Sequence, residues 1–164
     1  MPAITNPRQT ILVSCRGKAS VLGREVAKDN IITLSWHMPT SFEPMMYAIA
    51  IGKTRFSAKL IQQSRVFCVN FVPLSMEKEA SYCGRNSGEH VDKFEEKNIL
   101  KEECEKINCP RLKEAIGFME CEVVNEVEAG DHIIFIGEVL YSELKDESAK
   151  RLFQKGGTDF TTTR

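Results

Sequence analysis

The sequence predicts a mainly β fold, in which antiparallel strands form a barrel or sandwich and helices are inserted between them. Most apolar runs are short, rich in β-branched residues and followed by turn-forming residues, a pattern typical of strands. The last two runs are joined by EAGDH at residues 128–132, a turn that suits antiparallel neighbours. Strands and helices do not alternate regularly, which disfavours a doubly wound parallel sheet.

Six strands are expected along the chain. The first four are apolar runs; the third, MMYAIAI, ends at Gly52, and the fourth, VFCVNF, ends before Pro73. The fifth, CEVVNEV, alternates apolar and polar residues, and the sixth, IIFIGEVLY, is almost entirely apolar. Together they are expected at residues 10–15, 31–35, 45–51, 66–71, 121–127 and 133–141.

Helical signals are fewer. One segment, TRFSAKLIQQ at residues 54–63, presents apolar side chains on one face, as an amphipathic helix does. A second short helix, MEKEASYC, can be capped by Ser75 and ended by Gly84. The charged stretch at residues 93–105 is only weakly periodic, and residues 109–116 are expected to form one further helical turn.

Length, composition and charge limit the classes of protein. The 164 residues fit one domain over residues 1–164, and a 42% share of hydrophobic residues argues against a disordered or fibrous chain. The net charge of −1 gives no general attraction to nucleic acid or to an anionic membrane. No apolar run approaches the roughly 20 residues that span a bilayer, and the N-terminus has no hydrophobic signal core. A soluble cytoplasmic protein with no nucleic-acid or membrane partner is therefore expected.

Six cysteines are present. A disulfide framework is not expected, because nothing marks the chain as secreted and a domain of this size forms a core without bridges. Cys15 and Cys68 lie in apolar runs, where a thiol behaves as a small hydrophobe. Cys104 and Cys109 form the nearest pair but lack the second Cys or His pair of a zinc site, so no metal is expected. Cys83, in SYCGRNSGEH, is the most plausible exposed thiol.

The segment IAIGKTRFSAKL at residues 49–60 has the composition of a phosphate site. A strand ends there, Gly52 allows a close turn, and two cations and two hydroxyls follow. These are Lys53, Thr54, Arg55 and Ser57. A phosphate requires charge, hydroxyl donors and free main-chain N–H groups at a helix N-terminus. The alternative is that Thr54 is only a helix N-cap and that the cations are merely solvated.

The one Trp of the chain opens the stretch WHMPTSFEP at residues 36–44, directly after an apolar run. Trp36 is either a core residue at the end of a strand or one wall of a site for a flat, partly polar ligand. The run at residues 45–51 joins this stretch to the GKTRFS turn and spans about 23 Å, so we expect the two segments at opposite ends of one strand. A ligand with a flat ring and a phosphate, such as flavin mononucleotide (FMN), has about the length needed to reach both.

With these two segments in place, the chain resembles the flavin reductase-like group of FMN-binding split barrels, which includes flavoredoxins and archaeal ferric reductase-type proteins. The resemblance covers roughly residues 30–160 and lies in the order and spacing of its motifs, because no single motif is specific. These motifs are Asn30-Ile31-Ile32-Thr33-Leu34-Ser35-Trp36, Ser41 with Pro44, Thr54 followed by Leu60-Ile61, Phe67-Cys68-Val69-Asn70, Asp92-Lys93-Phe94, Gly130-Asp131-His132, and Gly156-Gly157 with Phe160-Thr161.

The resemblance implies a six-stranded antiparallel split barrel that forms a homodimer, with tightly bound FMN in a cleft near the dimer interface. It implies that residues 35–41 line the isoalloxazine ring and that the GKTRFS turn holds the phosphate and the ribityl chain. The candidate cofactor-binding residues are Asn30, Ser35, Trp36, His37, Met38, Ser41, Gly52, Lys53, Thr54, Arg55 and Ser57.

Few residues are candidates for catalysis, which fits flavin chemistry, because the cofactor carries the electrons and the protein positions it. The resemblance implies that His132 contacts the nicotinamide of NAD(P)H; the alternative is that Asp131 and His132 only shape the hairpin. His37 either tunes the flavin or is a surface imidazole. Asn70 ends a buried strand and needs a hydrogen-bond partner, which is either main chain or ligand.

The sequence favours an NAD(P)H-dependent flavin or ferric reductase. One alternative is a flavoredoxin-type electron carrier with tightly bound FMN and little reactivity toward nicotinamide. Others are a non-catalytic flavin or haem binder and a redox sensor that uses Cys83. The sequence does not distinguish NADH from NADPH, a nicotinamide from a protein electron donor, or prosthetic FMN from FMN used as a substrate, and it does not name the acceptor.

Overall fold

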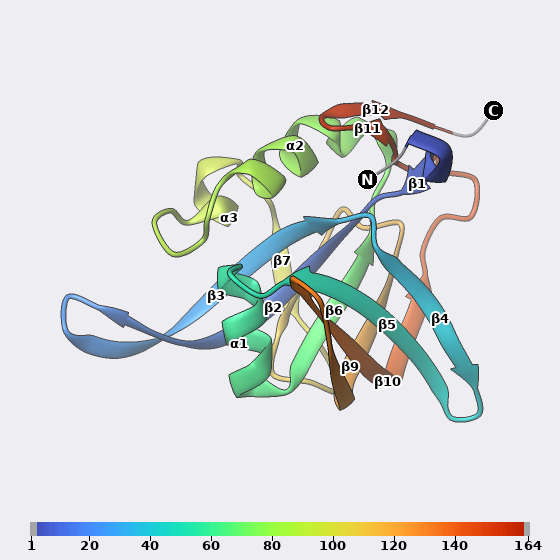
Figure 1. The fold of residues 1–164 in the computed structure, drawn as a ribbon. Coiled ribbons are helices and arrows are strands. Elements are labelled where there is room, and N and C mark those ends of the chain that lie inside the picture. The colour runs from blue at the N-terminus through green and yellow to red at the C-terminus, as the bar shows by residue number, and fades with distance from the viewer. Residues whose placement is uncertain (1–2, 163–164) are drawn as a thin grey trace.

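The computed structural model describes residues 3–162, and its main element is a seven-stranded antiparallel sheet (Figure 1). The strand order is β3-β2-β6-β9-β10-β5-β4. The strands are β2 (Ile11–Val21), β3 (Arg24–Leu34), β4 (His37–Phe42), β5 (Met45–Gly52), β6 (Val66–Phe71), β9 (Gly117–Ala129) and β10 (His132–Leu144).

The sheet curls so that β3 approaches β5. In the link between β3 and β4, the carbonyl of Trp36 accepts a hydrogen bond from the Ala50 N–H at 2.9 Å. The fold is therefore the mainly β, antiparallel split barrel with inserted helices that was expected, and β4 adds a seventh strand to the expected six.

Shorter elements surround the barrel. Figure 1 shows α2 and α3 on the same side as the small sheet that brings the two ends of the chain together. That sheet has the order β1-β11-β12, and β7 pairs with β8 elsewhere. The elements are η1 (Ala3–Thr5), β1 (Arg8–Gln9), α1 (Phe56–Ser64), η2 (Leu74–Met76), α2 (Glu77–Arg85), α3 (Lys93–Glu96), β7 (Lys101–Glu103), β8 (Pro110–Leu112), β11 (Phe153–Gly156) and β12 (Asp159–Thr161).

The main core fills the barrel and reaches α1. Phe67 and Phe135 are fully buried inside it, and α1 adds Leu60 and Ile61. Each such side chain stabilises the fold by about 1.5–3 kcal/mol through burial of apolar surface. A Cβ on Gly17 of β2 would lie 2.9 Å from Cδ2 of Leu60, so glycine is what lets α1 pack this closely on the sheet. This packing fixes where the first turn of α1 lies.

A second core cluster lies between the barrel and the helices α2 and α3. It joins Leu12 and Ile31 of the sheet to Ala80, Cys83 and Phe94 of the helices. Thr33 Oγ1 of β3 also donates a hydrogen bond to the carbonyl of Ala80 at 2.6 Å. These contacts hold α2 along the end of β3, where it forms one side of the cleft described below.

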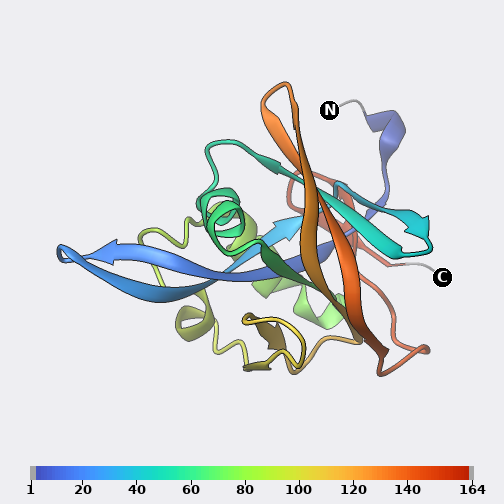
Figure 2. The ribbon, with the colours of Figure 1, turned by 90° about the horizontal axis from the view of Figure 1, so that it is seen from below.

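All six expected strands are present, and the structure extends most of them. The EAGDH hairpin is confirmed, with Gly130 in the left-handed region at φ 62°. Residues 10–15 and 31–35 are only the inner halves of β2 and β3, whose outer halves project from the barrel as a two-stranded arm (Figure 2). The arm turns at Leu22 and Gly23, both with positive φ. Its charged sequence lacks the apolar signal of a core strand.

Two segments were assigned wrongly from the sequence. Residues 37–42, which were not among the expected strands, form the edge strand β4, because the main chain pairs with β5 and an edge position tolerates proline. Residues 110–112, expected within a helical turn, form β8, which pairs with β7. In the charged stretch 93–105, only Lys93–Glu96 is helical. Both errors concern segments whose conformation depends on a partner strand.

Three smaller expectations also change. Ser75 provides no side-chain cap, because the short helix η2 precedes α2. Cys83 is buried in the second core cluster, so the expectation of an exposed thiol there is wrong. Asn70 is satisfied by main chain and by Ser14, including a 2.9 Å hydrogen bond from the Leu112 N–H. Among the residues described, no helix is both long and apolar enough to cross a membrane.

Candidate functional site

A cleft of about 270 Å³ opens where the ends of β3 and β5 meet α2 and the β9–β10 turn. One wall is formed by Ser35 and Trp36, and the turn contributes His132. The segment around β11 and β12 closes the third side. The lining residues are Ile32, Thr33, Leu34, Ser35, Trp36, Ala50, Gly52, Arg55, Ala80, Ser81, Gly84, Arg85, His132, Gln154, Gly157, Thr158 and Phe160.

Trp36 and His132 form the aromatic part of the cleft. Their rings stack with centroids 4.6 Å apart and planes inclined by 28°. His132 Nδ1 lies 2.7 Å from Asp131 Oδ1, and this hydrogen bond holds the pKa of the Asp131 carboxyl below its usual range. Nδ1 donates to Asp131, and Nε2 faces the side of Gly52. Trp36 therefore lies at the cleft, half-buried, and does not close the core.

The position of Trp36 relative to the GKTRFS turn differs from the expectation. We expected the two segments at opposite ends of residues 45–51, but β4 runs back antiparallel along β5 and pairs His37 with Ile49. Ser35 and Trp36 therefore lie beside Ala50 and Gly52, next to the turn. The ring and phosphate ends of a ligand would thus occupy neighbouring sites at one end of β5.

A second cavity of about 110 Å³ adjoins the cleft and shares Ile32, Arg55 and Gly84 with it. It collects polar groups from the start of α1, from β3 and from the loop around α3. Its lining residues are Asn30, Ile32, Thr54, Arg55, Phe56, Ser57, Cys83, Gly84, Asn86, Ser87, Gly88 and Lys93.

Two buried polar residues form the floor of this second cavity. Lys93 is only 4% exposed, and its Nζ donates to the carbonyls of Ile31 at 2.7 Å and Cys83 at 2.8 Å. Burial lowers the pKa of Lys93. Asn30 donates through Nδ2 to Ser57 Oγ at 2.8 Å, but its Oδ1 is buried without a partner. The ammonium of Lys93 has one free donor position, and the amide oxygen of Asn30 has no partner. A polar ligand would satisfy both groups.

The start of α1 also faces this cavity. Arg55 is the N-cap residue and makes no side-chain capping bond, so the N–H groups of the first turn are not capped by a side chain. The alternative that Thr54 is the N-cap is therefore wrong. An uncapped N-terminus carries positive partial charge and suits an anion. Together with Arg55 and Lys93, the first turn fits a phosphate.

The structure brings eight of the twelve candidate residues to the two cavities. Those at the cleft or at the second cavity are Asn30, Ser35, Trp36, Gly52, Thr54, Arg55, Ser57 and His132. Lys53 points elsewhere, because its Nζ forms an ion pair with Glu128 at 2.6 Å. Met38 and Ser41 lie further along β4, outside both cavities.

His37 is neither at the cleft nor a free surface imidazole. Its Nε2 lies 2.9 Å from the carbonyl of Gln9 and its Nδ1 lies 2.6 Å from the Tyr47 hydroxyl. The carbonyl requires a proton on Nε2, so in the neutral ring Nδ1 accepts from Tyr47. Burial lowers the pKa of His37. It ties β1 to the barrel and does not contact the cavities.

Several cavity residues were missed in the sequence. Lys93 is the main one: it belongs to the Asp92-Lys93-Phe94 motif of the resemblance but was given no role. The local structural signal there is Asp92, whose carboxylate caps α3 through the Phe94 N–H at 2.9 Å. Gln154 accepts from Ser35 Oγ at 2.9 Å and so connects the C-terminal segment to the cleft. Neither Lys93 nor Gln154 stands out in the sequence, because the role of each depends on how the chain packs. Within residues 3–162, no group of three or more His, Cys, Asp or Glu side chains could hold a metal ion.

Comparison with known proteins agrees with this geometry. Residues 5–161 match the family model described as the flavin reductase like domain. Over 116 residues the chain is 36% identical to an uncharacterized protein of Archaeoglobus fulgidus, covering 71% of this chain and 66% of the relative. Over 128 residues it is 27% identical to a ferric-chelate reductase (NAD(P)H) of the same organism, covering 74% and 75%. The chain spans 40% of the length of one of the relatives and 20% of the length of two others.

Among solved structures, the flavoredoxin of Desulfovibrio vulgaris (Miyazaki F) has the same fold. It superposes with a TM-score of 0.83 at 20% sequence identity and covers 98% of this chain and 88% of its own. At this identity the likeness concerns the fold alone. Because the family model extends over nearly the whole chain, the chain belongs to the flavin reductase-like domain family.

Proposed function

We propose that the protein binds FMN, with the phosphate in the second cavity and the isoalloxazine ring in the cleft. The observation that carries this proposal is the continuity of the two cavities, which share Arg55, together with the buried ammonium of Lys93. The unpaired Oδ1 of Asn30 is an acceptor, so it suits a hydroxyl of the ribityl chain and not the phosphate. Two cations, two hydroxyls and an uncapped helix start suit a phosphate dianion. The adjoining cleft offers an indole and main-chain groups to a flat ring.

We further propose that the protein is an NAD(P)H-dependent flavin or ferric reductase. Bound FMN would supply the redox chemistry, accepting electrons from a nicotinamide and passing them to an acceptor. The role of this chain is to hold the FMN and to orient the reacting groups. Asp131 accepts a hydrogen bond from the imidazole of His132, which lies at the cleft and would contact the nicotinamide. The name of the ferric-chelate reductase among the relatives supports this choice of donor.

The stack of Trp36 on His132 favours a second candidate function. Trp36 covers one face of the imidazole that a nicotinamide would contact. If the stack persists when flavin is bound, the protein is a flavoredoxin-type carrier that takes electrons from a protein donor. The fold shared with a flavoredoxin is compatible with this alternative.

Spectroscopy and anaerobic reduction test both functions. Protein loaded with FMN should show an oxidised-flavin absorption spectrum, and a preparation that cannot be loaded contradicts the whole proposal. Reductase activity predicts that NADH or NADPH bleaches the flavin in a stopped-flow experiment. The carrier function predicts no bleaching by either nicotinamide but bleaching by a reduced ferredoxin-type donor. Replacing Thr54 and Arg55 with Ala should weaken FMN binding while the folded spectrum in circular dichroism is retained.

We also propose that the protein is a single-domain homodimer located in the cytoplasm. The hairpin of β4 and β5 exposes Phe42 and Met45, a register pair of apolar side chains that a second copy could cover, and it also exposes Met38. All six cysteines are free, as expected in a reducing compartment. Sedimentation equilibrium should give a dimer, and Phe42→Glu should shift it toward monomer. A wild-type monomer at all concentrations contradicts this proposal.

A further inference from the structure

Three cysteines converge at a site separate from the cleft. Cys68 and Cys109 are fully buried in a small apolar cluster with Phe118, and Cys104 packs against it half-buried. Cys104 and Cys109 bound the loop at residues 104–109, which joins β7 to β8. None of these cysteines lines the cleft or the second cavity, so flavin binding does not account for the cluster.

The loop lies over one row of side chains that crosses three strands. Ser14 of β2 is the register partner of Cys68 in β6, and Cys68 is the partner of Glu120 in β9. Register partners point to the same face of a sheet. Above this row, Cys109 Sγ lies 3.3 Å from the Ser14 carbonyl, so the end of the loop is directly beside Cys68.

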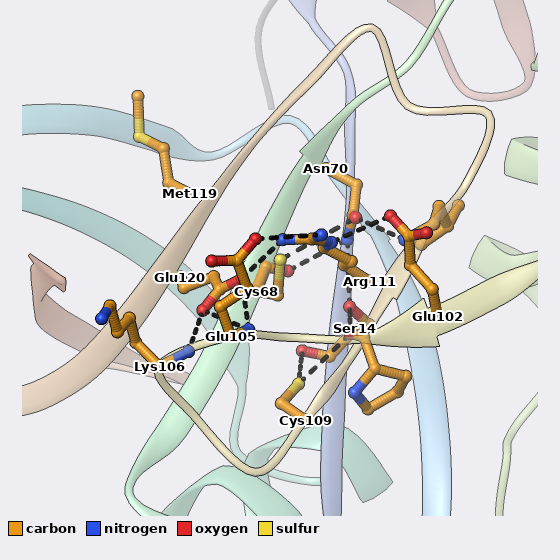
Figure 3. Close-up of polar contacts among 12 residues, drawn as sticks. Ser14, Cys68, Asn70, Glu102, Glu105, Lys106, Cys109, Arg111, Met119 and Glu120 are labelled. Atoms are coloured by element: carbon orange, nitrogen blue, oxygen red, sulfur yellow. Dashed lines mark hydrogen bonds and ion pairs between the residues drawn. The ribbon is translucent and has the colours of Figure 1, made fainter. Parts of the chain in front are cut away.

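Glu120 fixes the other end of the loop (Figure 3). This fully buried carboxylate accepts hydrogen bonds from the N–H groups of Glu105 at 2.9 Å and Lys106 at 2.7 Å. Arg111 Nη1 donates to the same carboxylate at 3.0 Å. Glu105 and Lys106 directly follow Cys104, so these bonds hold Cys104 over the row that contains Cys68.

Cys104 and Cys109 also face each other across the β7–β8 hairpin. Glu103 and Pro110 are the last register pair, and the Cys104 N–H donates to the Cys109 carbonyl at 3.0 Å. Facing residues of an antiparallel ladder have Cα atoms about 5.5 Å apart at such a position. Disulfides need a Cα separation of roughly 4.4–6.8 Å. The hairpin can therefore accept a bridge between these two residues without rearrangement of the strands.

The chemistry of the three thiols is unequal. The neighbouring thiols of Cys109 and Cys68 lower the pKa of Cys104, whereas burial raises the pKa of Cys109 and of Cys68. Cys104 is also the only one of the three that reaches solvent. A half-exposed thiolate beside a buried thiol is the arrangement in which one cysteine is oxidised first and the other resolves it.

We propose that Cys104 and Cys109 form a reversible redox pair that reacts with hydrogen peroxide. The Cys104 thiolate attacks one peroxide oxygen, the O–O bond breaks, and hydroxide leaves, which gives Cys104 sulfenic acid. The Cys109 sulfur then attacks the Cys104 sulfur, the S–O bond breaks, and the disulfide forms. The proton of Cys109 leaves with the departing hydroxide as water. One peroxide is thereby reduced by two electrons and two thiols are oxidised.

Cys109 is the resolving residue, and Cys68 is not. Cys68 lies in the central strand β6, which is paired on both sides by β2 and β9, so its main chain cannot move toward the loop. Cys109 directly precedes the short strand β8, and Cys104 directly follows its partner strand β7, so both cysteines lie at the loop end of this hairpin. A disulfide between Cys104 and Cys109 closes only the short loop at residues 104–109.

The test is peptide mapping of the whole protein after treatment with equimolar hydrogen peroxide, followed by alkylation under denaturing conditions. Alkylatable thiols should fall from the six free cysteines to four. Trypsin cleaves after Lys101, Lys106 and Arg111, so the expected product is a disulfide between peptides 102–106 and 107–111. Dithiothreitol should restore all thiols. A bridge to Cys68, six unreacted thiols, or oxidation that dithiothreitol does not reverse would overturn the proposal.

Variants check the order of the two steps. Cys109→Ser should stop at a sulfenic acid on Cys104, detected as a dimedone adduct on peptide 102–106. Cys104→Ser should give neither adduct nor bridge. Cys121→Ser, which removes a buried thiol outside the pair, should leave the bridge unchanged. A dimedone adduct on Cys109 in place of Cys104 would contradict the proposed order, and the mapping of the unsubstituted protein decides the pair even if a variant does not fold.

Discussion

The indole of Trp36 stacks on the imidazole of His132, with ring centroids 4.6 Å apart. The two residues come from distant parts of the chain, one from the link between β3 and β4 and the other from the β9–β10 turn. They meet because β5 pairs with β4 on one side and with β10 on the other. Trp36 is therefore a wall of the cleft that packs on a second candidate residue, His132.

The first prediction concerns Trp36 as a contact of the flavin ring. Trp36→Ala should weaken FMN binding by roughly 2- to 10-fold, because stacking of aromatic rings contributes about 0.5–1.5 kcal/mol. Trp36→Phe should retain most of the affinity, since it keeps an aromatic face. Quenching of flavin fluorescence on titration measures both. Equal affinity for wild type and Trp36→Ala would mean that Trp36 only supports the main chain of the cleft wall.

The second prediction separates Lys93 from Lys53. Lys93→Met should lower FMN affinity at least about 10-fold, because a charge-assisted hydrogen bond to a phosphate contributes about 1.5–3 kcal/mol. Its effect on riboflavin, which lacks the phosphate, should be small. Lys53→Met is the matched control and should change neither affinity, because Nζ of Lys53 is paired with Glu128.

Isothermal titration of wild type and both variants with FMN and riboflavin measures the six affinities. Urea unfolding of both variants shows whether the loss is one of binding or of folding. If Lys53→Met loses more FMN affinity than Lys93→Met does, the phosphate lies beside Lys53, as the sequence alone predicted.

The sequence contains enough information for the barrel because its inner strands carry strong apolar signals. Residues 45–51 and 66–71 were expected almost to the residue, since each is an apolar run with a turn residue behind it. The hairpin at residues 121–141 was recognisable from its turn. The outer halves of β2 and β3 were not recognisable from the sequence, because they are charged and do not face a core.

The site was predictable only where its residues are neighbours in the sequence. Thr54 and Arg55 precede α1 and Ser57 lies in its first turn, and this local pattern predicts the phosphate end that we propose. Lys93 contributes from a distant loop, and a lone lysine gives no sign of burial. The orientation of β4 was also hidden, because only pairing with β5 shows that Trp36 lies beside the turn.

The third prediction is a loss of stability on acidification that depends on His37. Burial lowers the pKa of His37, so the unfolded chain binds a proton at a higher pH than the folded protein does. Stability is therefore fully present above the unfolded pKa of about 6.5 and falls as the pH decreases toward the lower folded pKa. Protonation also costs Nδ1 its role as acceptor for the Tyr47 hydroxyl.

Urea unfolding at a series of pH values measures this dependence. His37→Gln should flatten the slope below about pH 6.5. His90→Gln is the matched control, because His90 is exposed, and should leave the slope unchanged. A slope that is the same in wild type and in His37→Gln would assign the acid sensitivity to other groups.

The fourth prediction concerns the buried carboxylate of Glu120, which is fully inaccessible and bonded to Arg111 and to two main-chain N–H groups. Glu120→Ala leaves the guanidinium of Arg111 without its most buried partner and frees the loop at residues 104–109. Removal of one partner of a buried ion pair costs about 3–5 kcal/mol. Glu126→Ala is the control, because its ion pair with Arg65 is partly exposed and should contribute less than about 1 kcal/mol. The free energy of unfolding in urea measures the loss of stability in both variants.

If Glu120→Ala loses no more stability than Glu126→Ala does, then Glu102 and Glu105, which also contact Arg111, compensate for the missing carboxylate.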